Sequence, residues 1–184
     1  MSIVDNRKVY DKISKEGETM EKPIHLPRWE ELPVIDLYID QVVTLLEEWL
    51  DFIPHSDEKL ITKSMINNYV KHGIVEAPKK RRYTTTHLAY LIVVCIFKQV
   101  YSMNEITQMI RLQVHAYPIE QAYNYYIEDL EACILSIYNG EAVTHQKVDT
   151  NDPLTKILHS VNESLVNKFN VQRLIKEVKE KNVE

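Results

Sequence analysis

A chain of 184 residues with 45% hydrophobic residues, 27% charged residues and a net charge of −5 is long enough to bury a core and typical of a globular protein. Its three glycines, Gly17, Gly73 and Gly140, disfavour a β-rich fold with many tight turns and exclude a glycine-rich phosphate-binding loop. The longest apolar run, residues 88–97, is too short to span a bilayer, and residues 1–22 lack the apolar stretch of a secretory signal, so we expect a cytoplasmic protein without membrane contact.

The first 33 residues are predicted to contain no regular structure. Residues 1–22 are expected to form a loosely packed arm, and residues 23–33 an extended lead-in, because proline blocks helices and this short segment has three: Pro23, Pro27 and Pro33. Trp29 lies among these prolines and is expected to hold the lead-in against the body of the protein.

Hydrophobic periodicity predicts an all-α protein with one short β-hairpin. Thr62 is expected to cap a helix at 63–71 and Gly73 to end it. Ser102 and Glu105 form a capping box that opens a later helix. The segment 76–84 is short, basic and contains proline, and we expect it to form a hairpin wing between the helices predicted at 63–71 and 85–100. Apolar residues recur at helical spacing in six segments: 36–53, 63–71, 85–100, a segment beginning after Ser102, 119–138 and about 153–178.

Charge is distributed unevenly along the chain. Residues 60–98 contain one acidic residue, Glu76, and seven basic ones: Lys63, Lys71, Lys79, Lys80, Arg81, Arg82 and Lys98. Seven basic residues and one acidic residue give this segment a net charge of +6, so the remainder of the chain carries −11. An acidic protein with one basic module suits a local anionic partner, and nucleic acid is the first candidate.

The order of features in this basic segment resembles the MerR-type winged helix-turn-helix regulators. The matching features are Thr62, Ile66, Tyr69, Gly73-Ile74-Val75, Arg81-Arg82-Tyr83, Thr84–Leu88 and Ser102–Ile106. The resemblance implies a bacterial transcription regulator that binds double-stranded DNA as a homodimer, without catalysis or a cofactor. It implies a MerR-like winged-helix domain at residues 34–112, after an arm and lead-in at 1–33 and before a helical region for dimerisation or an effector at 113–184.

Two other stretches resemble a less characterised group. LPRWEELPVIDLYIDQV and MINNYVKHGIV are similar to segments of an uncharacterised bacterial family, a domain of unknown function thought to be regulatory. That resemblance covers most of the chain, but it implies no ligand or target.

The polar face of the helix at 63–71 supplies the expected base and phosphate contacts. Its members are Lys63, Ser64, Asn67, Asn68 and Lys71. Asparagine pairs bidentately with adenine in the major groove, and Asn67 shares a stripe with both lysines, so we expect it to be the main base reader. The expected wing contacts to the DNA backbone are Lys79, Lys80, Arg81 and Arg82. Tyr83 is expected to pack at the base of the wing, with its hydroxyl available to a phosphate.

Other candidate sites have weaker patterns. The seven histidines include no pair four residues apart, and Cys95 and Cys133 are isolated in apolar runs, so we expect no metal site and buried free thiols. No nucleophile, base and acid fall in a recognisable order, so we expect no enzyme. Four tyrosines form an aromatic cluster in the sequence: Tyr117, Tyr123, Tyr125 and Tyr126. The cluster is interpreted either as a binding site for a small-molecule effector or as a packing interface.

The last predicted helix is longer than one globular helix needs, and its apolar stripe shifts at residues 168–170. Pairing of this helix is therefore expected, either with a second copy of the chain as a dimer or against the predicted helix at 119–138. A winged-helix module that binds another protein, as an adaptor or anti-regulator, is the alternative to DNA binding.

Overall fold

The structure, a computed structural model, is all-helical over the residues that it describes, which are 24–54, 59–139, 141, 145 and 152–181. The predicted arm at 1–22 and most of the linker at 141–151 lie outside these residues. The described elements are a short 3-10 helix, η1 (Trp29–Glu31), and six α-helices: α2 (Ile39–Trp49), α3 (Lys63–Lys71), α4 (Thr85–Phe97), α5 (Met103–Ala116), α6 (Ile119–Tyr138) and α7 (Pro153–Lys181). The expectation of an all-α protein is confirmed.

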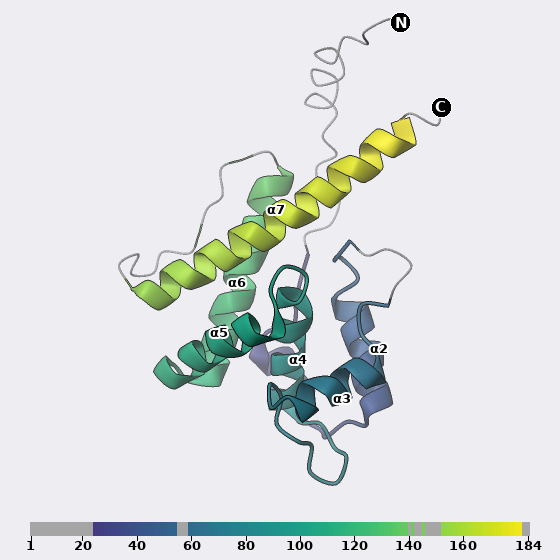
Figure 1. The fold of residues 1–184 in the computed structure, drawn as a ribbon, viewed down its shortest axis with the longest axis vertical. Helices are drawn as coiled ribbons and strands as arrows, with labels where there is room; N and C mark the ends of the chain where they lie inside the picture. The colour runs from purple at the N-terminus through teal and green to yellow at the C-terminus, as the bar shows by residue number, and fades with distance from the viewer. Residues whose placement is uncertain (1–23, 55–58, 140, 142–144, 146–151, 182–184) are drawn as a thin grey trace, which may run out of the picture.

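Helix α4 lies at the centre of the molecule (Figure 1). It is apolar on nearly every side, and nine of its thirteen residues are buried, which is the pattern of a helix surrounded by others. Helices α6 and α7 form the most extensive helix pair among the described elements, and one continuous core runs from Leu26 to Phe169. None of the described helices is both long and apolar enough to cross a membrane.

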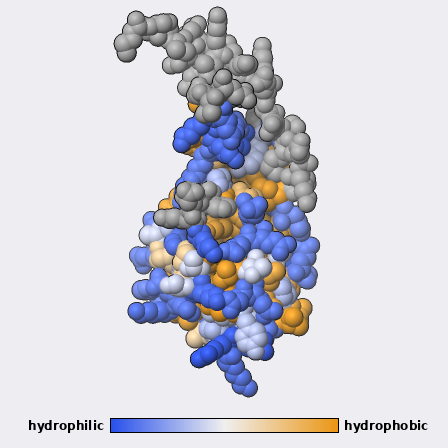
Figure 2. All heavy atoms as spheres, turned by 90° about the vertical axis from the view of Figure 1, so that its right-hand side faces the viewer, coloured by the Kyte–Doolittle hydropathy of each residue, from blue (hydrophilic) through white to orange (hydrophobic). Residues whose placement is uncertain are grey.

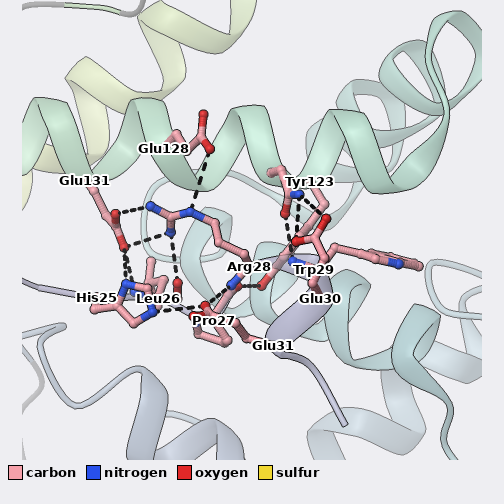
Figure 3. Close-up of polar contacts among 11 residues, drawn as sticks. His25, Leu26, Pro27, Arg28, Trp29, Glu30, Glu31, Tyr123, Glu128 and Glu131 are labelled. Carbon is pink, nitrogen blue, oxygen red and sulfur yellow. Dashed lines mark hydrogen bonds and ion pairs between the residues drawn. The ribbon is translucent and has the colours of Figure 1, made fainter. Parts of the chain in front are cut away.

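The proline-containing lead-in is fixed to α6 (Figure 3). The Arg28 guanidinium donates to both carboxylate oxygens of Glu131, at 3.0 and 2.5 Å. The Trp29 ring packs edge-on against Tyr123 with 6.3 Å between centroids, and the Tyr123 hydroxyl donates to the Pro27 carbonyl at 2.8 Å. These contacts confirm that Trp29 holds the lead-in against the body, and they show that Arg28 does the same through charge.

Helix limits agree with the sequence for two helices and differ by a few residues for others: α4 ends at Phe97 and not at residue 100, and α7 extends to Lys181. The limits of α3 and α6 are as predicted, and the Ser102–Glu105 capping box is present, with the Ser102 amide donating to the Glu105 carboxylate at 2.8 Å. Helix α2 is shorter than the predicted 36–53. It begins late because Leu37 forms a backbone bridge to Tyr83, which requires an extended conformation.

The predicted β-hairpin wing is wrong. The described residues contain no strand, and the segment between α3 and α4 has only two isolated bridges, Lys79 to Arg82 and Leu37 to Tyr83. A hairpin would need the residues outside Lys79 and Arg82 to pair next. Pro78 and Tyr83 would point their backbone polar groups away from each other in such a pair, and Tyr83 uses its amide and carbonyl on Leu37, at 2.8 and 2.9 Å. The next hydrogen bonds would therefore have to join Ala77 and Thr84. The Thr84 amide instead donates to His87 Nδ1 at 3.0 Å and its carbonyl accepts from Leu88, because α4 begins there. The segment therefore closes as a single tight turn.

Candidate nucleic-acid interface

Local sequence makes α3 short and directs its polar residues outward. The Thr62 side chain caps its first turn by accepting the Met65 amide at 3.2 Å. Ile66 and Tyr69 are buried and attach the helix to the core. Gly73 has a φ of +67°, the left-handed conformation that glycine adopts without strain, and this ends the helix. A nine-residue helix is thus held by one side, and the other side is left in solvent.

All five α3 residues expected to contact DNA are exposed: Lys63, Ser64, Asn67, Asn68 and Lys71. Lys63 has an ion-pair partner within the described part of the chain, because its ammonium group pairs with the Asp40 carboxylate on α2. This pair is largely exposed, so a phosphate can replace Asp40 as the partner of Lys63 at little cost.

Residues 79–82, here named the basic turn, place cations at the tip of the loop between α3 and α4. The Arg82 amide donates to the Lys79 carbonyl at 2.9 Å and closes the turn. Lys80 and Arg81 have φ angles of 51° and 61°, a pair of left-handed residues like that of a type I′ turn, which glycine and asparagine usually occupy. A side chain with a Cβ costs roughly 1 kcal/mol in this conformation. Despite this strain, the turn adopts the conformation and exposes three cationic side chains, those of Lys79, Lys80 and Arg81.

Arg82 and Tyr83 anchor the basic turn instead of extending into solvent. The Arg82 guanidinium lies 3.6 Å from the centroid of the Tyr38 ring and donates to the Asp36 carbonyl at 3.3 Å. Tyr83 is only 3% exposed, and burial raises the pKa of its phenol. The structure therefore gives both residues a packing role, and the Tyr83 hydroxyl is not presented to a partner.

The basic turn and α3 lie at the same end of the molecule. Arg82 covers Tyr38 and Lys63 pairs with Asp40, so both segments contact the beginning of α2. This end lies opposite the C-terminal end of α7 (Figure 1), and its side chains are mostly hydrophilic (Figure 2). A groove of about 680 Å³ continues from the turn toward α5, and Lys79, Arg82 and Arg111 contribute to its walls. The cations on α3 and the turn therefore form one surface.

The four tyrosines of the predicted effector cluster do not form one site. Tyr117 is exposed and donates to Asp152, whereas the hydroxyl of buried Tyr123 donates to Pro27. The hydroxyl of Tyr125 bonds His159 on α7 at 2.8 Å. Tyr126 is buried against Phe97, with 5.2 Å between ring centroids. Tyr117 lies before α6, and helical spacing along α6 directs the other three side chains to different surroundings, so the four share no pocket as a group.

A second polar cluster was not predicted from the sequence. The structure brings together the carboxylate of Asp129 and the imidazoles of His145 and His159, with the Cys133 thiol beside them. Their linear spacing matches no common ligand motif, which is why histidine spacing alone predicted nothing. One signal was present: Asp129 and Cys133 are four residues apart on the apolar face of α6, where an ionisable residue is unexpected.

Fold and surface together define an all-helical protein with an exposed polar helix beside a basic turn. The chain belongs to the family described as a domain of unknown function (DUF1836), whose model matches residues 27–126. This match confirms the expected membership of an uncharacterised family and includes α3 and the basic turn. No curated protein and no solved structure matches the chain, and nothing in these comparisons supports the relationship to MerR-type regulators.

Proposed function

We propose that this protein binds double-stranded DNA through α3 and the basic turn and regulates transcription. One observation carries the proposal: the polar face of α3 is exposed beside three solvent-facing cations, in a segment of net charge +6 on a chain whose remainder sums to −11. Folding does not explain this surface, because exposed charges contribute little to stability and the turn is strained. Attraction to a polyanion explains both features.

In this proposal α3 enters the major groove and the basic turn follows the phosphate backbone. A nine-residue helix is about 13 Å long, enough to present two turns of side chains to a groove about 12 Å wide. Asn67 lies in the middle of the exposed stripe and pairs with adenine. Lys63 and Lys71, at the two ends of α3, reach phosphate or guanine.

A second copy of the chain completes the proposed regulator. Beyond Phe169 no described residue of α7 is classed as buried, and three apolar residues are exposed at spacings of four and three: Val171, Ile175 and Val178. This spacing is that of a helix pairing seam. A dimer would present two α3 helices to half-sites one DNA turn apart, or a multiple of that distance.

The basic turn provides the direct test. Replacement of Lys79, Lys80 and Arg81 by alanine should make the slope of log affinity against log salt shallower by about 0.9 for each phosphate that the protein no longer neutralises, so by about 2–3. The measurement is fluorescence anisotropy of the full chain on labelled duplex DNA over a range of salt concentrations. Duplexes are taken first from a binding-site selection with the unaltered protein.

A matched control removes the same charge elsewhere. Lys156, Lys176 and Lys179 are exposed on α7, and their triple alanine variant should keep the salt slope of the unaltered protein. Equal slopes for the two triple variants, or no DNA selected above background, would contradict the proposal.

A second candidate function has its own observation. Val34 and Ile35 are 89% and 72% exposed and precede Tyr38 beside the basic turn, which gives this end of the molecule an apolar patch. Contiguous exposed apolar side chains are typical of surfaces that bind proteins. Replacement of Val34 and Ile35 by serine distinguishes the two functions, since it should leave DNA affinity unchanged and weaken a protein complex.

A further inference from the structure

A cavity with apolar walls lies among α4, α5, α6 and α7 and has a volume of about 70 Å³. None of the fifteen residues in its walls is charged, and four of them are aromatic: Tyr90, Phe97, Tyr123 and Tyr126. Protein interiors contain few voids larger than a single water molecule, which needs about 10–15 Å³. The cavity is several times larger than that, so it exceeds the ordinary gaps of a packed core.

The polar atoms of the walls are largely directed elsewhere. The Gln113 amide donates to the Leu154 carbonyl at 3.1 Å, and the Tyr123 hydroxyl donates to the Pro27 carbonyl at 2.8 Å. The Tyr126 hydroxyl is enclosed by protein atoms, so this residue presents its ring to the cavity. An ordered water molecule needs two to four polar partners, and these walls therefore favour an apolar occupant over water.

Helix α5 covers the cavity without filling it. Ile106 is its only buried residue out of fourteen, although the helix lies against the core. Met109 and Ile110, one turn further along, are half-buried and form part of the cavity wall. Methionine has three rotatable bonds and adapts its shape to what it contacts. The wall that α5 provides can therefore adjust around an occupant.

The cavity is open to solvent at an edge formed by α5 and α7. Val114 on α5 and Ile157 on α7 both belong to the walls, and each is 36% exposed. Small-molecule sites in helical proteins are concave and mostly apolar, and they lie between helices in this way. A ligand can therefore enter without unfolding of the protein, and part of it can remain in solvent.

The size and chemistry of the cavity select the class of ligand. A dry apolar cavity of about 150 Å³ takes up benzene, and about half that volume suits the end of a narrow chain better than a complete ring. Walls without charge exclude an ionic group from the interior, so a polar head would stay at the opening. We propose that this cavity binds the end of an unbranched alkyl chain of a small amphiphilic molecule. The site shares no residue with α3 or the basic turn, and it does not depend on DNA binding.

The first experiment titrates the full chain with unbranched primary alcohols, from propanol to decanol. Binding is followed by NMR through the methyl signals of Met109, Ile157 and Leu158, which belong to the walls. Each methylene group that enters the cavity should tighten binding by about 4-fold. The gain should stop once the chain fills the cavity, because further methylene groups remain in solvent.

A variant that fills the cavity tests its location. Ala122→Leu on α6 enlarges a side chain of the wall, and it should weaken hexanol binding by about 16-fold or more, the cost of displacing two methylene groups. It should also raise the melting temperature, because it fills empty space, and this rise separates loss of binding from loss of structure. Ala132→Leu is the matched control, since Ala132 is half-buried on the same helix but outside the walls, and this variant should bind hexanol as the unaltered protein does.

Two results would overturn the site. One comes from the unaltered chain and does not depend on whether a variant folds: no binding, or binding that tightens up to decanol without a limit, which is the behaviour of adsorption to an apolar surface. The other is an Ala122→Leu variant that is at least as stable as the unaltered protein and binds hexanol as tightly as Ala132→Leu. Either result would leave the cavity as empty space between the helices.

Discussion

The basic surface, which consists of the polar face of α3 and the basic turn, exposes its polar groups to solvent, whereas the Asp129 cluster buries them. On α3 and the basic turn, cations stand in solvent and their interactions with the rest of the protein are few and exposed. At Asp129, a buried carboxylate is surrounded by Asn162, Cys133 and two histidines. Exposed charges are available to an outside partner and contribute little to folding. A buried charge is costly unless its partners are complete, so its removal or isolation strongly affects stability.

The largest effect on stability is expected at the buried carboxylate. Asp129→Ala should lower the free energy of unfolding by about 3–5 kcal/mol, because Asn162 and the histidines lose their shared acceptor inside the protein. The measurement is urea denaturation of the variant and of the unaltered protein. Asp51→Ala, at an exposed aspartate, should stay within about 0.5 kcal/mol of the unaltered protein. Similar decreases in both variants would remove the contrast between the two regions.

On the basic surface, the largest single-residue effect is expected in base preference. Asn67→Ala should reduce the preference for the correct base at one operator position by about 1–3 kcal/mol of binding free energy, the value of a bidentate asparagine–adenine pair. It should leave the salt slope of binding unchanged. A binding-site selection with this variant measures the effect. Asn104→Ala, at an exposed asparagine on α5, is the control. The same motif with the same information content from Asn67→Ala and the control would show that Asn67 does not read bases.

The smallest effect is expected at the strained turn, where stability and binding should change in opposite directions. Arg81→Gly should raise the free energy of unfolding by about 0.5–1 kcal/mol, because glycine adopts the φ of 61° without a Cβ clash. The same change should weaken DNA binding, since it removes one cation. Arg81→Ala removes the same charge and keeps the strain, so thermal melts of the two variants separate the two effects. A glycine variant no more stable than the alanine variant would show that the turn stores no strain.

The local sequence predicted those parts of the fold that depend on neighbours a few residues apart. The limits of α3 and α6, the Ser102–Glu105 capping box and the burial of Ile66 and Tyr69 follow from helical periodicity and capping rules. The candidate basic surface was also predictable as a set of residues. Charge and polarity are properties of the residues themselves, and helical spacing placed the α3 members on one face.

Longer-range pairing decided what the sequence could not. Tyr83 pairs with Leu37, 46 positions earlier, and no local rule reveals that Tyr83 has a partner there. The packing of Arg82 on Tyr38 has the same origin. Both interactions change what the basic turn presents to solvent, so the shape of the proposed interface is a tertiary property.

By itself, the sequence determined six helices and the face of α3 that stays exposed, because helix formation and amphipathicity depend on residues three and four positions apart. Only the tertiary structure decided where the polar groups of α6 and α7 meet. Asp129, His145 and His159 are 16 and 14 positions apart along the chain, and the packing of α6 on α7 brings side-chain oxygen and nitrogen atoms of the three within 4.8 Å of one another. Such a meeting depends on the angle and register of two helices, which side-chain packing across the whole interface sets and no local pattern encodes.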